Sequence, residues 1–325
     1  MEESTSKVSI VIPVYNGSDF LREAIDSALD QSYPNIEVLV INDGSRDEGK
    51  TEAIARSYGD KISYLSKENG GVASALNLGI REMSGRYFCW LSHDDLYYPK
   101  KTEEQVRLMA GAGEDCVLYG DFEYIDAYGR SLGIKRTGPA QRCGITYSLI
   151  MEGTINGCTV MIPRCFFERV GLFDEALRTT QDFDMWFRLA EHYPFRHQAQ
   201  VIVKSRMHPN QGSLTIPGHL AEQNALYMKA LELFSVQDLA QGAGETLASF
   251  YVKAAIRFVS IGCDRAAEQA IARFGREFFR FADAPVRIAA NTCWYAVYTV
   301  LRVAYRSPRI KTIVKKINKK ISLQR

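Results

Sequence analysis

Residues 87–95 read YFCWLSHDD, an apolar run that ends in two adjacent carboxylates. The apolar part is typical of a buried strand, so we expect Asp94 and Asp95 at the carboxyl end of that strand. Open α/β sheets bind their ligands at this edge. Two like charges in such a place need compensation by a cation or by strong hydrogen-bond donors. The alternative is a solvated turn, because Asp-Asp shortly before a proline, here Pro99, is also common in loops.

The segments around this stretch alternate between strand-like and helix-like patterns. Short apolar runs lie at 8–13, 36–41, 62–65 and 87–91. Helical spacing follows at 21–29, and we expect further helices at about 47–58 and from residue 70 onward. This alternation predicts a parallel α/β sheet. Because the strands are apolar on both faces, helices are expected to cover the sheet on two sides.

The rest of the chain divides into a mixed part and a helical part. Strand-like segments at 116–119, 122–125, 158–163 and 200–203 and a helix at 181–193 continue the mixed pattern. Residues 131–146, rich in glycine and basic residues, are expected to form a surface loop. From about Leu220 onward the pattern is helical. We therefore predict an α/β domain over 6–217 and a helical region over 218–325, with the boundary near Pro217-Gly218.

Composition excludes several classes of protein. With 46% hydrophobic and 24% charged residues the chain of 325 residues is globular, and a net charge of +2 argues against a dedicated nucleic-acid binder. Seven cysteines without a Cys-x-x-Cys pair indicate neither a disulfide framework nor a zinc site, and fit reduced thiols in a cytosolic protein. Residues 1–7 lack the apolar segment of a signal peptide. The chain contains no run of about 18 apolar residues, so we expect no membrane-spanning helix.

Five short segments that carry chemistry follow one another along the chain. They read VSIVIPVYN at 8–16, EVLVINDGS at 37–45, NGGVASALNLGI at 69–80, GRYFCWLSHDD at 85–95 and TQDFDMWFRL at 180–189. In this order and spacing the chain resembles the inverting nucleotide-sugar glycosyltransferases of family 2, over roughly its first two-thirds. The resemblance implies a GT-A fold: a Rossmann-like mixed, mostly parallel sheet with flanking helices, here followed by the helical region.

The resemblance implies a set of residues that bind the nucleotide-sugar donor. Tyr15 would line the pocket of the base, and Asp43 would accept an N–H group of a pyrimidine such as uracil. The alternative for Asp43 is a turn or helix cap. Residues 69–71 open a helix, where backbone N–H groups favour phosphate or ribose oxygens. The full set is Pro13, Tyr15, Asn16, Asp43, Asn69, Gly71, Asn77 and Asp94.

A divalent cation is the cofactor that the resemblance implies. Asp94 and Asp95 match the metal motif of the family, which commonly reads Asp-Ser-Asp-Asp, although Ser92 replaces the leading carboxylate. One of them is expected to hold Mg²⁺ or Mn²⁺ between the two donor phosphates, and which one stays open. His208 lies in a further family-like segment and is the third candidate ligand, with a structural histidine as the alternative.

Gln181-Asp182-Phe183-Asp184 matches the catalytic Glu-Asp-x-Asp segment of the family. The resemblance makes Asp182 the general base that takes the proton of the acceptor hydroxyl, with Asp184 as the second candidate. The alternative is that both acids merely begin a helix, where they favour the dipole. Two further departures from the family are Gln181 in place of Glu, and Leu76 where the family often carries an arginine that contacts the diphosphate.

The C-terminus is strongly basic, with nine Lys or Arg and no Asp or Glu among the last 24 residues. An apolar stripe at helical spacing runs through it: Ile310, Ile313, Val314, Ile317 and Ile321. Such a helix is typical of a segment that lies on an anionic membrane. The alternative is a helix docked on the catalytic domain with a solvated basic tail. Nucleic acid fits less well, because aromatic residues do not alternate with these charges.

Together these features predict a cytoplasmic, metal-dependent inverting glycosyltransferase that is peripheral to the inner face of the cell membrane. The favoured donor is a UDP-sugar, and the favoured acceptor is a lipid-linked glycan in cell-surface polysaccharide or lipopolysaccharide synthesis. Two alternatives are a non-catalytic scaffold that binds sugar nucleotides or membranes, and a sugar nucleotidyltransferase. The second is disfavoured because residues 14–18 carry no cation that would stabilise phosphoryl transfer.

Overall fold

The structure is a computed structural model that describes residues 6–112, 116–138, 144–153, 155–209, 211, 215–239, 246–278 and 299. The chain divides into two compact units. The first comprises the chain up to Gln141 together with Thr154–Pro217, and the second comprises Arg142–Gly153 together with the chain from Gly218. The basic amphipathic segment at 310–321 lies outside the described residues.

The first unit contains the predicted sheet. Its strands are β1 (Val8–Val14), β2 (Ile36–Asn42), β3 (Ser63–Ser66), β4 (Tyr87–Trp90) and β8 (Ile162–Pro163), in the spatial order β3-β2-β1-β4-β8. The first four pair in parallel and β8 is antiparallel to β4. The prediction of a mixed, mostly parallel sheet is therefore confirmed. The first two residues of the predicted strand at 158–163 belong instead to a 3-10 helix, η3 (Gly157–Thr159).

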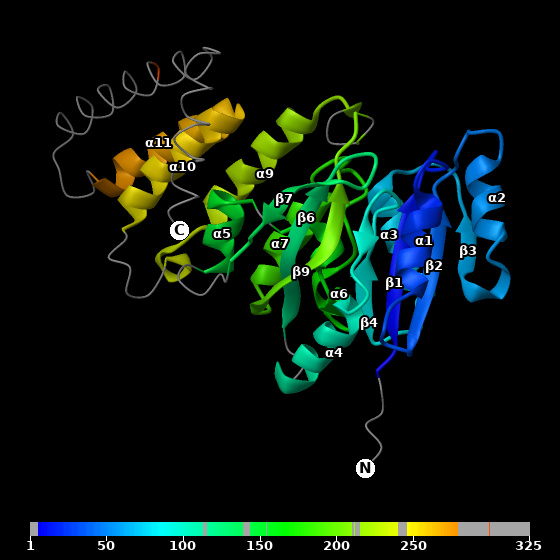
Figure 1. Cartoon of the computed structure of the whole chain (residues 1–325). Coiled ribbons are helices and arrows are strands. Elements are labelled where there is room, and N and C mark those ends of the chain that lie inside the picture. The colour runs from blue at the N-terminus through cyan, green and yellow to red at the C-terminus, as the bar shows by residue number, and fades with distance from the viewer. Residues whose placement is uncertain are drawn as a thin grey trace. The chain divides into compact units, whose positions relative to one another are not determined.

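Helices cover both faces of this sheet (Figure 1). The connecting elements are α1 (Leu21–Leu29), α2 (Lys50–Arg56), η1 (Gly59–Lys61) and α3 (Val72–Glu82). Side chains alternate along β1, so Ile10 and Ile12 join the core that contains Ile25 of α1. Val11 points to the other face and lies against Gly79 of α3, where an added Cβ would stand 2.3 Å from a Val11 methyl group. The absence of a side chain at Gly79 thus lets α3 pack directly on β1.

A second sheet in the same unit has the order β5-β9-β6-β7. Its strands are β5 (Leu96–Tyr97), β6 (Val117–Ile125), β7 (Ser131–Lys135) and β9 (Phe195–Arg206). The expected strands at 116–119 and 122–125 form one strand, and β9 extends well beyond the expected 200–203. The expected loop at 131–146 begins with β7, because the Asp126 carboxylate accepts the N–H groups of Tyr128 and Arg130 and closes a hairpin with β6.

The remaining elements of the first unit are α4 (Lys101–Ala112), α6 (Phe166–Val170) and α7 (Gln181–Ala190). The predicted helix at 181–193 ends three residues earlier than expected. Its last turn closes because His192 and Tyr193 both donate their N–H groups to the carbonyl of Leu189.

The second unit is helical in its described residues. It contains α5 (Ile145–Met151), α9 (His219–Leu233), η4 (Val236–Asp238), α10 (Leu247–Ile261) and α11 (Asp264–Phe278). Phe250 of α10 stacks on Phe234 at 3.7 Å between ring centroids and contacts Tyr147 of α5. Among the described helices, none combines the length and apolar composition needed to cross a membrane.

Candidate functional site

Three strands of the parallel sheet end at one edge and deliver the predicted donor residues there. In the register of the sheet Val14 pairs with Asn42, and Val11 pairs with Trp90. Residues that follow β1, β2 and β4 therefore emerge side by side. They include Tyr15 after β1, Asp43 after β2 and the turn at 92–95 after β4.

Asp43 is buried and holds the loop that precedes α3. Its Oδ1 accepts hydrogen bonds from Gly70 N–H at 2.9 Å and from Lys67 Nζ at 2.8 Å, and its Oδ2 accepts Gly71 N–H at 2.7 Å. Asn69 Nδ2 donates to the Asp43 carbonyl at 2.9 Å. An ionised carboxylate has about four lone-pair positions, so these contacts leave one position on Oδ2 for a further donor.

The N–H groups of Gly70 and Gly71 have a partner within the protein. Both donate to the Asp43 carboxylate, so these donors, which we expected to favour phosphate or ribose oxygens, are engaged in holding the loop. Gly71 remains important for shape, because its backbone φ of +91° lies in the region that favours glycine. The cap prediction for Asp43 and the ligand prediction are compatible, since its side chain organises the loop and keeps one acceptor position.

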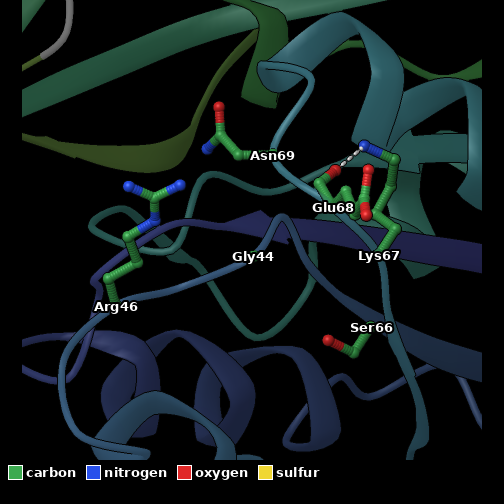
Figure 2. Close-up of a pocket in the computed structure, with 6 residues that line it drawn as sticks. All are labelled: Gly44, Arg46, Ser66, Lys67, Glu68 and Asn69. Atoms are coloured by element: carbon green, nitrogen blue, oxygen red, sulfur yellow. Dashed lines mark hydrogen bonds between the residues drawn. The ribbon is translucent and has the colours of Figure 1, made fainter.

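A pocket opens at the ends of β2 and β3, beside Asp43. It has a volume of about 740 Å³ and is lined by Gly44, Arg46, Ser66, Lys67, Glu68 and Asn69. Figure 2 shows the Lys67 ammonium turned back to the carbonyl oxygen of Glu68, while Arg46 and Asn69 extend from the other end of the pocket. Two of these lining residues, Arg46 and Lys67, are positively charged and Glu68 is negatively charged, and Lys67 is paired with Asp43.

The segment after β1 is fixed to the segment after β2. Asn16 Oδ1 accepts Arg46 N–H at 2.7 Å, and Asn16 N–H donates to Ser45 Oγ at 2.9 Å. Asn16 has a positive φ of +50°, a conformation that asparagine tolerates better than most residues. Tyr15 is 43% exposed, so its ring is available to a ligand. Pro13 lies within β1, paired with Ile41, and is buried.

Asp94 and His208 meet although they lie far apart in the sequence. His208 Nε2 is 2.9 Å from Asp94 Oδ2, and the two side chains are only 11% and 14% exposed. The His208 ring also lies 5.3 Å from the ring of Phe20. A carboxylate and an imidazole that converge in this way fit two ligands of a divalent cation such as Mn²⁺.

Asp95 has a position that differs from the prediction for a metal ligand. Its Oδ1 accepts Arg206 N–H at 2.8 Å, and its Oδ2 accepts the Cys158 thiol at 3.3 Å. Burial and the neighbouring Asp94 carboxylate raise the pKa of Asp95. We therefore assign Asp95 to the support of the turn, and Asp94 to the ligand face. Within the described ranges no three His, Cys, Asp or Glu side chains gather around one point, so phosphate oxygens or water would have to complete the cation's shell.

The predicted catalytic acids stand at the start of α7. Burial raises the pKa of Asp182 to about 6, although its Oδ1 accepts the N–H of Phe183, which lowers it. Asp184 is buried, and its Oδ2 pairs with Arg188 Nε at 2.7 Å. Arg188 also donates to the carbonyls of Val170 and Leu172. A carboxylate held in this way is a structural anchor, so the geometry favours Asp182 over Asp184 as a base.

The contacts of Asn77 differ from those expected of a residue that binds the nucleotide-sugar donor. It is 1% exposed, and its amide both donates to the Phe173 carbonyl and accepts the Phe173 N–H, each at 2.9 Å. Its Nδ2 also donates to Glu175 Oε1 at 2.8 Å. All three contacts tie α3 to the segment that leads to α7, so we do not retain Asn77 as a donor ligand.

Three basic residues near the site escaped the sequence analysis as site residues. Lys67 contacts Asp43, Arg178 Nη1 donates to the Gly70 carbonyl at 3.1 Å, and Arg206 lies beneath the turn at 92–95. The sequence gives only a weak indication for Lys67, which stands two residues before Asn69, the first residue of the third motif. Arg206 stands two residues before His208, in the same family-like segment, whereas Arg178 reaches the site through a tertiary contact that no local spacing reveals.

A family model described as "Glycosyl transferase family 2" matches residues 9–176. An uncharacterized glycosyltransferase of Rickettsia felis is 47% identical over 236 residues, which cover 71% of this chain and 39% of that protein. The chain thus spans about two fifths of this relative. An uncharacterized glycosyltransferase of Rickettsia typhi is 46% identical over 245 residues, which cover 74% of this chain and 76% of that protein.

One further relative and a group of solved structures extend the comparison. The putative teichuronic acid biosynthesis glycosyltransferase TuaG of Bacillus subtilis is 32% identical over 191 residues, 56% of this chain and 71% of that protein. The crystal structure of S. aureus TarS in complex with UDP-GlcNAc matches with a TM-score of 0.59. This match covers 83% of this chain and 81% of the TarS chain at 16% identity, and it shows the fold alone.

We expect Asn77→Ala to destabilise the protein by about 2–4 kcal/mol, because it leaves the buried N–H and carbonyl of Phe173 without partners. Asn77→Asp should destabilise it further, since it loses the donor and sets a negative charge against Glu175. Urea unfolding measures both. A loss of less than about 0.5 kcal/mol for Asn77→Ala would contradict this structural role.

Proposed function

The chain belongs to glycosyl transferase family 2, and from this premise we propose that it moves a sugar from a nucleoside diphosphate to an acceptor hydroxyl with inversion at the anomeric carbon. The observation that carries the proposal is the convergence, at one sheet edge, of the Asp43 loop and the Asp94–His208 pair. The first offers a place for a base and the second a place for a diphosphate with its cation.

The base side of the site favours uridine. Asp43 Oδ2 keeps one acceptor position, which matches the single imide N–H of uracil. Tyr15 is exposed at the adjacent strand end and offers an aromatic ring for stacking. TarS, which shares the fold, has been crystallised with UDP-GlcNAc and with UDP. These observations support a UDP-sugar as the donor.

Asp94 and His208 are the residues that would hold Mg²⁺ or Mn²⁺. When bound, the cation supplies positive charge that stabilises the departing nucleoside diphosphate. The protein's own part is to present one carboxylate oxygen and one imidazole nitrogen at a fixed separation, inside a site with little exposed surface.

Asp182 is the proposed general base. It would accept the proton of the acceptor hydroxyl while that oxygen forms a bond to the anomeric carbon and the bond to the diphosphate breaks. A single displacement of this kind inverts the configuration and needs one base. A pKa of about 6 leaves the Asp182 carboxylate ionised at neutral pH, yet more basic than an ordinary aspartate.

We propose a lipid-linked glycan as the acceptor and a peripheral position on the cytoplasmic face of the membrane. The support is the basic, amphipathic pattern at 310–321, which suits the surface of an anionic bilayer. The name of the relative TuaG refers to teichuronic acid biosynthesis, and this agrees with a role in cell-surface polysaccharide synthesis.

We expect Asp182→Asn to abolish sugar transfer while UDP binding stays at the wild-type level, because the amide cannot accept the proton. In the wild type, turnover should rise with pH through about 6 as Asp182 loses its proton, and then level off. Release of UDP from a panel of UDP-sugars measures the rate, and calorimetry measures UDP binding. Full transfer by Asp182→Asn would exclude Asp182 as the base.

Deletion of the residues after Arg306 should remove binding to vesicles that contain anionic lipid, since most of the basic cluster is lost. Co-sedimentation compares the truncated and full chains on anionic vesicles, with neutral phosphatidylcholine vesicles as the control. Equal sedimentation of both chains with the anionic vesicles would overturn the membrane proposal.

A further inference from the structure

We propose that Arg206 is a positioning residue that fixes the Asp94 carboxylate against His208. This inference rests on the proposed function, since it concerns the pair assigned to the cation and the diphosphate. Arg206 is 1% exposed, and a buried guanidinium needs most of its donors satisfied. The bonds of its side chain run to three separate segments of the chain.

Two hydrogen bonds, one from the side chain and one from the backbone of Arg206, hold the Asp94–Asp95 turn. Arg206 Nε donates to the Asp94 carbonyl at 2.9 Å, and the backbone N–H of Arg206 donates to Asp95 Oδ1 at 2.8 Å. Asp95 N–H in turn donates to the Ser92 carbonyl at 3.1 Å. The peptide between the two aspartates is thereby held in one orientation, in which the Asp94 side chain contacts His208 and the Asp95 side chain contacts Cys158 and the Arg206 N–H.

The remaining donors connect the turn with its surroundings. Arg206 Nη1 donates to the carbonyl of Ala127 in the β6–β7 turn at 3.1 Å, and Nη2 pairs with Glu23 of α1 at 2.8 Å. Glu23 is half-exposed, so this ion pair faces solvent on one side only. Arg206 therefore joins the strand end of β4, the start of α1 and the second sheet at one point.

Phe20 links the guanidinium with His208. The Arg206 Cζ lies 4.4 Å from the centroid of the Phe20 ring, and the same ring lies 5.3 Å from the ring of His208. Because His208 stands two residues after Arg206, the chain direction at the end of β9 also depends on the fixed Arg206 backbone. One residue thus sets the position of both members of the Asp94–His208 pair.

Loss of such a supporting contact commonly weakens metal binding by about 10- to 100-fold, and we expect this range for Arg206→Met. Mn²⁺ is titrated into the full chain, and the electron paramagnetic resonance signal of the free ion reports the affinity. Arg206→Lys keeps the charge but cannot span the three segments, so it should fall between the wild type and Arg206→Met. Excess Mn²⁺ should restore much of the turnover of Arg206→Lys.

Arg188→Met is the matched control. It removes another guanidinium that bonds a carboxylate and two backbone carbonyls of the same unit, at α7. It should leave the Mn²⁺ affinity unchanged, because the side-chain hydrogen bonds of Arg188 in the described structure run to Asp184, Val170 and Leu172 and not to Asp94 or His208. A role for Arg206 in general stability alone predicts that both variants behave alike.

A second readout needs no metal. Amide hydrogen exchange at residues 94–97 and 206–208 should become faster in Arg206→Met than in the wild type, and stay unchanged in Arg188→Met. If the wild type binds no Mn²⁺, the proposed function fails, while the exchange data still decide the role of Arg206. Unchanged Mn²⁺ affinity and unchanged exchange in a folded Arg206→Met would overturn the inference.

Glu23→Ala carries the test if Arg206→Met does not fold. It leaves Arg206 in place but removes its carboxylate partner, so exchange at 94–97 should still become faster and Mn²⁺ binding weaker. If Glu23→Ala matches the wild type in both measurements while Arg206→Met and Arg206→Lys fail to fold, the inference is wrong and Arg206 serves folding only.

Discussion

The parallel pairing of β1 with β2 on one side and with β4 on the other is the constraint on which the site depends. Parallel strands end at the same edge, so the residues that follow them meet without any special loop. Asp43, Tyr15 and Asp94 come from three motifs that are separated by tens of residues, and this topology alone makes them neighbours. The proposed base site and the Asp94–His208 pair both depend on that edge.

The two adjacent aspartates show how one turn separates two roles. Asp94 faces His208, whereas Asp95 faces inward and accepts the Arg206 N–H. A raised pKa lets Asp95 keep its proton more readily, and this reduces the repulsion between the neighbouring carboxylates. The leading acid of the family motif is Ser92 in this chain, which bonds the Cys158 thiol instead of a ligand. A single carboxylate therefore remains directed at the cation position that we propose.

Much of the fold followed from periodicity, because each strand of the parallel sheet is a short apolar run that ends at a polar turn. The placement of Asp43 after β2 and of Asp94 after β4 needed no more than this. The role of Asn77 could not be predicted from the sequence. The local sequence around α3 does not show whether its amide faces a ligand or bonds to the backbone of another segment. The same holds for β7, which depends on the turn at Asp126 and on pairing with β6.

Arg206 shows most clearly which contacts cannot be predicted from the sequence. Its partner Glu23 lies 183 residues away in sequence, and only the folded chain brings the two together. Asp184 was the second candidate for the base after Asp182, and its ion pair with Arg188, four residues further along α7, favours a supporting role for it. Motifs thus predicted which residue types stand at the candidate site, whereas the contacts in the folded chain favour a ligand role for some of them and a supporting role for others.

The most direct test of the central claim is a calorimetric titration of UDP into the full chain, with and without Mn²⁺. If the edge formed by β1, β2 and β4 binds a nucleoside diphosphate through Asp43 and the Asp94–His208 pair, UDP binds with Mn²⁺, binds more weakly without it, and binds more weakly to Asp43→Ala. Absence of UDP binding in both conditions would contradict the account.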